Sequence, residues 1–178
     1  MIYKLVKSND PTLRAVAQQF NFQDPPLNPF EFASDLKESM IAHRGFGLSA
    51  CQIGLPLKVF VAGDPNDPDN IKVFFNANIV SSSENMVLME EGCLSYPGLF
   101  IKVKRPDSVR IRYAKSSGDI VTDVFDGLPA RVIQHEYDHM SGVTFKIRAT
   151  KFHHEQAVRQ KKKLDKMRKI NEQRIRVL

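Results

Sequence analysis

Residues 135–139 read His-Glu-Tyr-Asp-His, and this pentapeptide constrains the fold more than any other part of the chain. Two imidazoles four residues apart can bind one ion if the segment is helical, because a helix places them on one face, one turn apart. Glu136 can then reach water on the metal without occupying a ligand position. The pattern therefore predicts a metal-binding helix; the alternative is two histidines that only pack or face solvent.

The flanking sequence supplies the ends of this helix and indicates two more. Pro129 falls in its first turn, and Gly142 can close it. A second helix is expected after Pro29, because apolar side chains recur there every four residues and fall on one face. A third, polar helix is expected over about 152–175. The apolar positions of the last two helices are Phe32, Leu36 and Met40, and then Val158, Leu164, Met167 and Ile170.

The middle of the chain is typical of β-strands. Short runs of β-branched and aromatic residues, several with an alternating pattern, lie at 57–62, 72–75, 100–104, 108–113 and 120–125. Because few of these strands are separated by helices, we expect an α+β fold, with mixed or antiparallel sheets around the central helix and a C-terminal helix besides. Residues 1–150 should form the body of a single domain, with the helix 151–178 appended to it.

The charge of the chain is distributed unevenly. The 178 residues carry a formal net charge of +6, but residues 1–150 are close to neutral and residues 151–178 hold ten Lys or Arg against three acids. No apolar run is long enough to span a bilayer, and the two cysteines are too few for a disulfide scaffold. The first residues lack the apolar run and cleavage site of a signal peptide, so none is expected. These features predict a cytoplasmic protein without a membrane or DNA partner.

A catalytic metal site needs a third protein ligand, and the sequence offers two candidates. Glu155 lies downstream of the histidines, as in one class of zinc peptidase, but no further pattern surrounds it. Cys93 lies in a turn-forming stretch after two acids, and a thiolate is a strong ligand for borderline ions. Cys51, beside Ala50 and Ile53, fits a buried and inert thiol better.

Residues 45–54, Gly-Phe-Gly-Leu-Ser-Ala-Cys-Gln-Ile-Gly, form a third unusual stretch. Its small residues allow a substrate to approach the backbone closely, and Gln52 offers an amide donor. A phosphate-binding loop is excluded, since neither the Lys-Ser/Thr pair nor a preceding strand is present.

Together, the segments 45–54, 91–95 (Glu-Gly-Cys-Leu-Ser) and 134–139 (Gln-His-Glu-Tyr-Asp-His) closely resemble the peptide deformylase family, over about residues 5–148. The resemblance implies removal of the formyl group from the N-formylmethionine of new polypeptides. It also implies that Glu136 acts as general base and acid toward metal-bound water. Gln52 and the Leu94 backbone N–H would donate to the developing oxyanion.

The resemblance further implies one divalent metal, natively Fe²⁺, with Zn²⁺, Ni²⁺ or Co²⁺ able to replace it, and Cys93, His135 and His139 as its ligands. The residues expected to bind the peptide or to support the site are Phe46, Gly47, Leu48, Glu91, Gly92, Leu128 and Val132. The basic residues 151–178 are a candidate contact to ribosomal RNA, and a solvated helix is the alternative. Departures from the family pattern include Ser49, where alanine is usual, and Phe100, where some members carry arginine. Arg131 is expected to rim the pocket or to face solvent.

Two other functions compete with this interpretation. The chain could be a zinc endopeptidase that uses His135, His139 and Glu155 as ligands. It could instead be a ribosome-binding or nucleic-acid-binding module in which four protein ligands close a structural metal site.

Overall fold

The computed structural model describes the backbone of residues 1–176 and the side chains of residues 1–171. Residues 177 and 178, the end of the segment 151–178 considered above, lie outside the described residues. The strands are β1 (Gly47–Ser49), β2 (Val59–Ala62), β3 (Lys72–Ser82), β4 (Met86–Gly92), β5 (Phe100–Pro106), β6 (Ser108–Ala114) and β7 (Ile120–Asp126). The helices are α1 (Pro29–Ala42), α2 (Gly127–Met140), α3 (Phe145–Arg148) and α4 (Lys151–Arg176).

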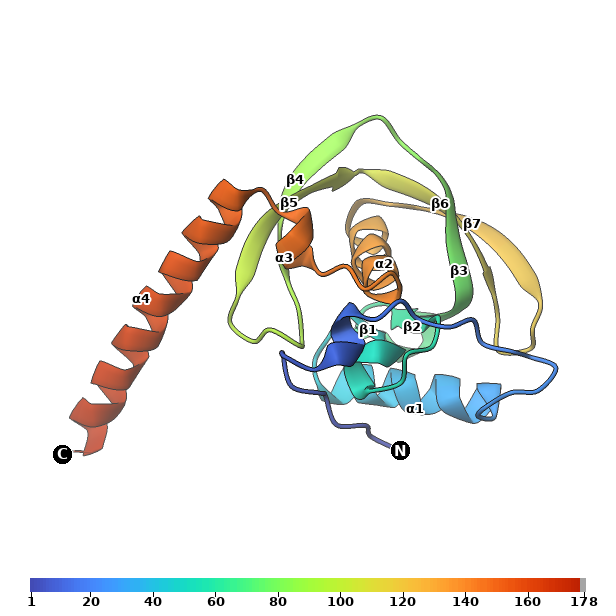
Figure 1. The fold of residues 1–178 in the computed structure, drawn as a ribbon, viewed down its shortest axis with the longest axis horizontal. Coiled ribbons are helices and arrows are strands. Elements are labelled where there is room, and N and C mark those ends of the chain that lie inside the picture. Colours follow the sequence, from blue (N-terminus) through green and yellow to red (C-terminus); the bar gives the residue numbers. More distant parts are fainter. Residues whose placement is uncertain (177–178) are drawn as a thin grey trace.

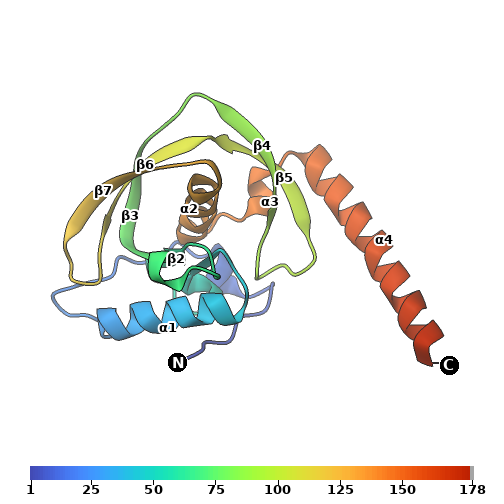
Figure 2. The same cartoon turned by 180° about the vertical axis from the view of Figure 1, so that it is seen from behind.

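The strands form two antiparallel sheets, one of five strands in the order β1-β2-β3-β6-β7 and one that pairs β4 with β5. Helix α2, which carries the His-Glu-Tyr-Asp-His segment, contacts strands of both sheets and lies within the curved wall that they make (Figure 1). The view from behind shows the same enclosure (Figure 2). The predicted α+β fold with a C-terminal helix is confirmed.

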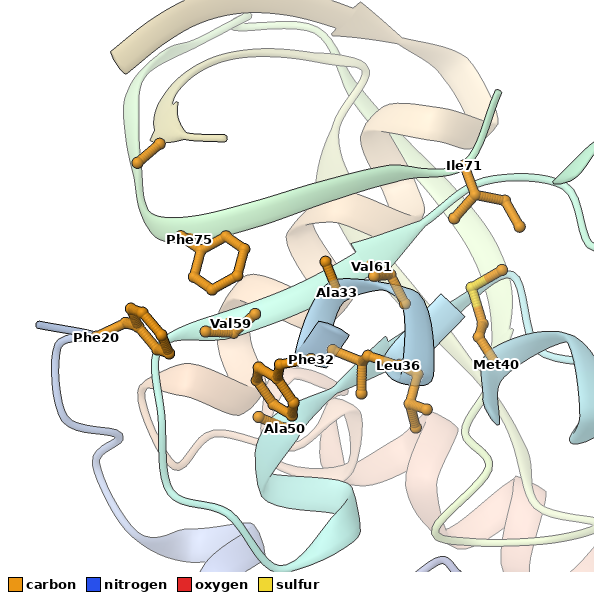
Figure 3. Packing of buried hydrophobic residues seen from close by; sticks show 12 residues of the cluster. Phe20, Phe32, Ala33, Leu36, Met40, Ala50, Val59, Val61, Ile71 and Phe75 are labelled. Atoms are coloured by element: carbon orange, nitrogen blue, oxygen red, sulfur yellow. The ribbon is translucent and has the colours of Figure 1, made fainter. Parts of the chain in front are cut away.

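Helix α1 packs across β1 and β2 through the predicted apolar face. Phe32, Leu36 and Met40 are all buried, and they meet Val59 and Val61 of β2 (Figure 3). Each such side chain contributes about 1.5–3 kcal/mol when it leaves water, so this face fixes α1 against the sheet. The helix begins after Asn28, whose side chain accepts from two backbone N–H groups of the first turn.

Helix α2 packs against the five-stranded sheet through a second apolar cluster. Ala130 and Ile133 pack with Phe60 of β2, Phe74 of β3 and Ile111 of β6, all buried. The rings of Phe60 and Phe74 stack with centroids 4.6 Å apart. This cluster takes up one face of α2, so the histidines project from another face.

Three stretches of strand differ from the sequence-based expectation. β1 and β4 were not predicted, and β3 continues to Ser82 instead of ending near Phe75. The continuation of β3 passes through Asn76, whose φ is +51°, and the pairing of β3 with β6 shifts register twice. Such bulges interrupt the alternation of apolar and polar side chains on which strand prediction depends.

Helix α4 packs against the body through its first half. Ala157 is buried and Val158 half-buried in a third apolar cluster with Leu99 and Ile101 of the β5 region and Phe145 of α3. Beyond this contact α4 extends away from the body (Figure 1). Among the described residues, no helix combines the length and apolarity needed to cross a membrane.

Candidate metal centre

The three expected metal ligands converge in the structure. One donor atom from each of Cys93, His135 and His139 lies within 4.8 Å of the others, and Cys93 Sγ is 3.3 Å from His139 Nε2. The two histidines come from consecutive turns of α2, and Cys93 comes directly after the end of β4. The motifs around residues 93 and 135 therefore meet although about forty residues separate them in the chain.

The surroundings of the two histidines orient their rings for metal binding. Burial lowers the pKa of His139 well below its usual value, which keeps its imidazole neutral. His139 Nδ1 is buried without a hydrogen-bond partner in the described chain, and His139 Nε2 faces Cys93 Sγ. His135 Nδ1 lies 3.0 Å from Glu91 Oε2, which fixes the proton on Nδ1 and leaves Nε2 free to bind a metal. One thiolate and two imidazoles fit Fe²⁺, Zn²⁺, Ni²⁺ or Co²⁺ better than Mg²⁺ or Ca²⁺.

Glu91 is held ionised beneath the ligands by two arginines. Arg105 donates from Nε and Nη2 at 2.6 and 3.0 Å, and Arg131 donates from Nη1 at 3.0 Å. Burial alone would raise the pKa of Glu91, but the hydrogen bonds from His135 and Arg105 outweigh it and lower the pKa to about 2. Glu91 therefore orients His135. Of the two roles expected for Glu91, peptide binding or support of the site, this contact favours support.

Arg131 does not face solvent, so that part of the prediction was wrong. Its side chain is only 5% exposed and donates to the carbonyls of Val87 in β4 and Val103 in β5, at 2.7 and 2.9 Å. The guanidinium thus joins α2 to both strands of the small sheet, and Arg131 also lines the cavity above the ligands.

The remainder of this ionic network was not anticipated from the sequence. Asp138, inside the pentapeptide, accepts from Arg105 at 2.7 Å and from Arg148 of α3 at 2.6 Å. The burial of Arg105 could have been predicted, because Ile101, Val103 and Arg105 alternate onto the inward face of β5. A charged residue in such a position requires a buried partner.

Glu136 lies beside the ligands with its carboxyl group almost entirely enclosed. Ser49 Oγ donates to Glu136 Oε2 at 2.6 Å, and a Cβ on Gly47 would come within 2.6 Å of Oε1. Burial raises the pKa of Glu136, although the Ser49 hydrogen bond opposes the shift. A raised pKa suits a carboxylate that takes up and returns a proton near neutral pH.

Gln52 is oriented by its own 3₁₀ turn. The Ser49 N–H donates to Gln52 Oε1 at 2.8 Å, so the amide Nε2 points toward Ser95 Oγ at 3.1 Å and Cys93 Sγ at 3.5 Å. The backbone N–H of Leu94 donates to no group in the part of the chain that is described. Two hydrogen-bond donors therefore lie beside the metal ligands.

A cavity of about 460 Å³ opens above the ligands. Most of the expected peptide-binding residues line it: Phe46, Gly47, Glu91, Gly92, Leu128 and Val132. Leu48 is the exception, since its side chain is fully buried in the core beneath α1 and does not reach the cavity wall. Alternation along β1 explains the difference, because Gly47 and Leu48 face opposite sides of the strand. Phe100, noted above as a departure from the family pattern, also lines the cavity and covers Gly92, where a Cβ would come within 2.7 Å of its ring.

The other candidate ligands lie elsewhere. Glu155 is on α4 and pairs with Arg159 at 3.4 Å, outside the converging group. Cys51 is buried, and desolvation raises the pKa of its thiol to about 12, which makes it an inert core residue.

Comparison with known proteins agrees with this geometry. Residues 2–155 match the family model described as polypeptide deformylase. A peptide deformylase of Pseudothermotoga lettingae is 39% identical over 145 residues (82% of this chain and 81% of that protein), and one of Brucella suis is 36% identical over 164 residues (89% and 91%). The crystal structure of a peptide deformylase from Legionella pneumophila superposes with a TM-score of 0.82 and 31% identity (94% of this chain and 98% of that one). The chain therefore belongs to the peptide deformylase family, the metal-dependent hydrolases that remove the N-formyl group from nascent polypeptides.

Proposed function

We propose that Cys93, His135 and His139 hold the single metal, that Glu136 is the general base and acid, and that Gln52 and the Leu94 N–H stabilise the oxyanion. The observation that carries this assignment is the convergence of the three donors within 4.8 Å, beside a cavity that Cys93, His135, Glu136 and Gln52 line. The direct experiment is deformylation of a formyl-methionyl peptide by the purified protein and by its Glu136→Gln variant.

Hydrolysis of a formamide needs a stronger nucleophile than neutral water. A divalent metal held by Cys93, His135 and His139 would supply it by lowering the pKa of a bound water molecule toward neutrality. Glu136 takes the proton that water loses on attack and returns it to the departing amine nitrogen as the carbon–nitrogen bond breaks. Gln52 and Leu94 donate hydrogen bonds to the formyl oxygen while it carries negative charge, and formate and the free amine leave.

The cavity accounts for a substrate that begins with N-formylmethionine. Phe46, Leu128 and Val132 form an apolar wall that suits the unbranched methionine side chain. The formyl carbon carries only hydrogen besides its oxygen and nitrogen, so a tight space beside the expected metal ligands would admit it and exclude an acetyl group.

Fe²⁺ is the metal that we assign to the native enzyme. Cys93 lines the cavity, so oxygen that enters can reach both its thiolate and a ferrous ion. Activity of the iron-loaded enzyme is expected to decay in air and to persist under nitrogen, while the nickel-loaded enzyme keeps its activity in both. Half-lives measured for the two metal forms check this, and equal half-lives of the iron form with and without oxygen would contradict it.

We further propose that the protruding half of α4 binds ribosomal RNA, which would place the enzyme in the cytoplasm beside emerging chains. This half is rich in Lys and Arg, and three apolar side chains on it remain exposed: Leu164, Met167 and Ile170, at 55%, 52% and 40%. Phosphate attracts the cations, and the apolar side chains supply contact area.

The first half of α4 is part of the folded body, so a test by deletion must spare it. Deletion of 151–178 would remove Ala157 from the third apolar cluster and destabilise the body, whereas deletion of 163–178 leaves that contact intact. Cosedimentation of the 1–162 protein with ribosomes is expected to be weaker at low salt, with unchanged turnover of short peptides.

Two triple Lys→Gln variants test the same proposal in the full-length chain. Replacing Lys162, Lys163 and Lys166 with Gln should weaken ribosome binding in a salt-dependent way. Replacing three exposed lysines elsewhere, Lys4, Lys7 and Lys115, should not. Equal losses in both triple variants would show that α4 acts only through net charge, and unchanged binding would leave it as a solvated surface.

A further inference from the structure

Ser49 connects the two halves of the catalytic machinery. It is the last residue of β1 and is buried; its backbone N–H donates to Gln52 Oε1 at 2.8 Å and its hydroxyl to Glu136 Oε2 at 2.6 Å. The hydroxyl is also 3.2 Å from the Glu136 carbonyl oxygen. A hydroxyl has one proton, and the shorter, charge-assisted bond to the carboxylate takes it.

The two oxygens of Glu136 are thereby made different. Oε2 is held by Ser49, whereas Oε1 accepts from no donor among the described residues. Gly47, two residues earlier on β1, leaves just enough room for the carboxyl group, since a Cβ there would lie 2.6 Å from Oε1 and 2.9 Å from Cδ. The carboxyl plane is therefore fixed from one side by the strand backbone and at one oxygen by the hydroxyl.

From this geometry we infer that Ser49 is a positioning residue for the reaction: it anchors Oε2 of Glu136 so that Oε1 carries the proton from water to the amine. The inference rests on the proposed role of Glu136 as the base. Without the hydroxyl, the carboxyl group can rotate about its last torsion, which is broad for glutamate. A smaller fraction of molecules then presents an oxygen correctly to the reacting atoms.

The test is the Ser49→Ala variant, which removes the hydroxyl but keeps the N–H that orients Gln52. We expect kcat to fall about tenfold, the scale of a hydrogen bond to a charged group, with KM changed less than about twofold. Metal content should stay at that of the wild type. The matched control is Ser39→Ala, which removes another buried serine hydroxyl, bonded to the Asp35 carbonyl in α1, and should leave kcat unchanged.

A double-mutant cycle shows whether Ser49 acts through Glu136. In a Glu136→Asp background the shorter side chain does not reach Ser49, so adding Ser49→Ala should change kcat by less than about twofold. An unchanged kcat in the single Ser49→Ala variant, an equal loss in both backgrounds, or loss of metal would overturn the inference. The Glu136→Gln variant distinguishes failure of the proposed function from failure of the role assigned to Ser49. If Glu136→Gln stays active, the proposed function fails. If it is inactive while Ser49→Ala has full kcat, only the role of Ser49 is refuted.

Discussion

Replacing Glu136 with Gln is expected to lower kcat for a formyl-methionyl peptide by about 10²–10⁴-fold, the usual contribution of a positioned acid–base group. Gln matches Glu in volume and can still bond to Ser49, but its amide cannot take up the proton that water must lose. KM and metal content should remain close to the wild-type values, because Glu136 is not among the converging ligands. Steady-state kinetics together with metal analysis of the same preparations measure all three quantities.

The matched control for this variant is Glu155→Gln. Glu155 is the ligand required by the zinc endopeptidase alternative, and it lies on α4, paired with Arg159. Its replacement should leave kcat and metal content unchanged. A Glu136→Gln enzyme with wild-type kcat would refute the assigned mechanism, and a Glu155→Gln enzyme without metal would favour the endopeptidase ligand set.

Replacing Cys93 with Ala is expected to abolish metal binding at stoichiometric concentration and, with it, deformylase activity. Two histidines would remain, and two imidazoles hold a divalent ion much more weakly than two imidazoles and a thiolate. Because Cys93 is only half-buried and the turn after it keeps its backbone hydrogen bonds, from Tyr96 N–H to the Cys93 carbonyl and from Leu99 N–H to the Tyr96 carbonyl, the fold should persist. Circular dichroism spectra should match those of the wild type.

Cys51→Ala provides the comparison for Cys93→Ala. Both variants remove one thiol from the same region, but Cys51 is buried in the core with its pKa raised to about 12. We expect Cys51→Ala to retain one metal per chain and measurable turnover. Retention of metal and activity by Cys93→Ala would contradict the ligand set.

Much of the fold follows from local patterns in the sequence. Phe32, Leu36 and Met40 recur at helical spacing and are buried in α1, and the inward residues of β5 and β6 alternate as strands require. The strands that were missed lack such a pattern. β1 has only three residues, all buried, and most side chains of β4 are exposed, so neither strand shows clear alternation. Their assignment depends on strand pairing, which is a tertiary property.

The candidate site was predictable where its motif is local and less so where partners are distant. The three expected ligands lie in local motifs. The supporting contacts do not, because Arg131 bonds to Glu91, 40 residues away in the chain, and to Val87, 44 residues away. No local pattern states which buried acid pairs with which buried arginine. Ser49 illustrates the same limit: this departure from the family pattern places a hydroxyl 2.6 Å from the Glu136 carboxylate.

The most direct test of the central claim is an anaerobic assay of the purified protein on formyl-Met-Ala-Ser, with metal analysis of the same sample. We predict release of formate and of free Met-Ala-Ser in equal amounts, with one divalent metal per chain and loss of turnover when a chelator removes it. Absence of turnover after the protein has been loaded in turn with Fe²⁺, Ni²⁺ and Co²⁺ would contradict the account.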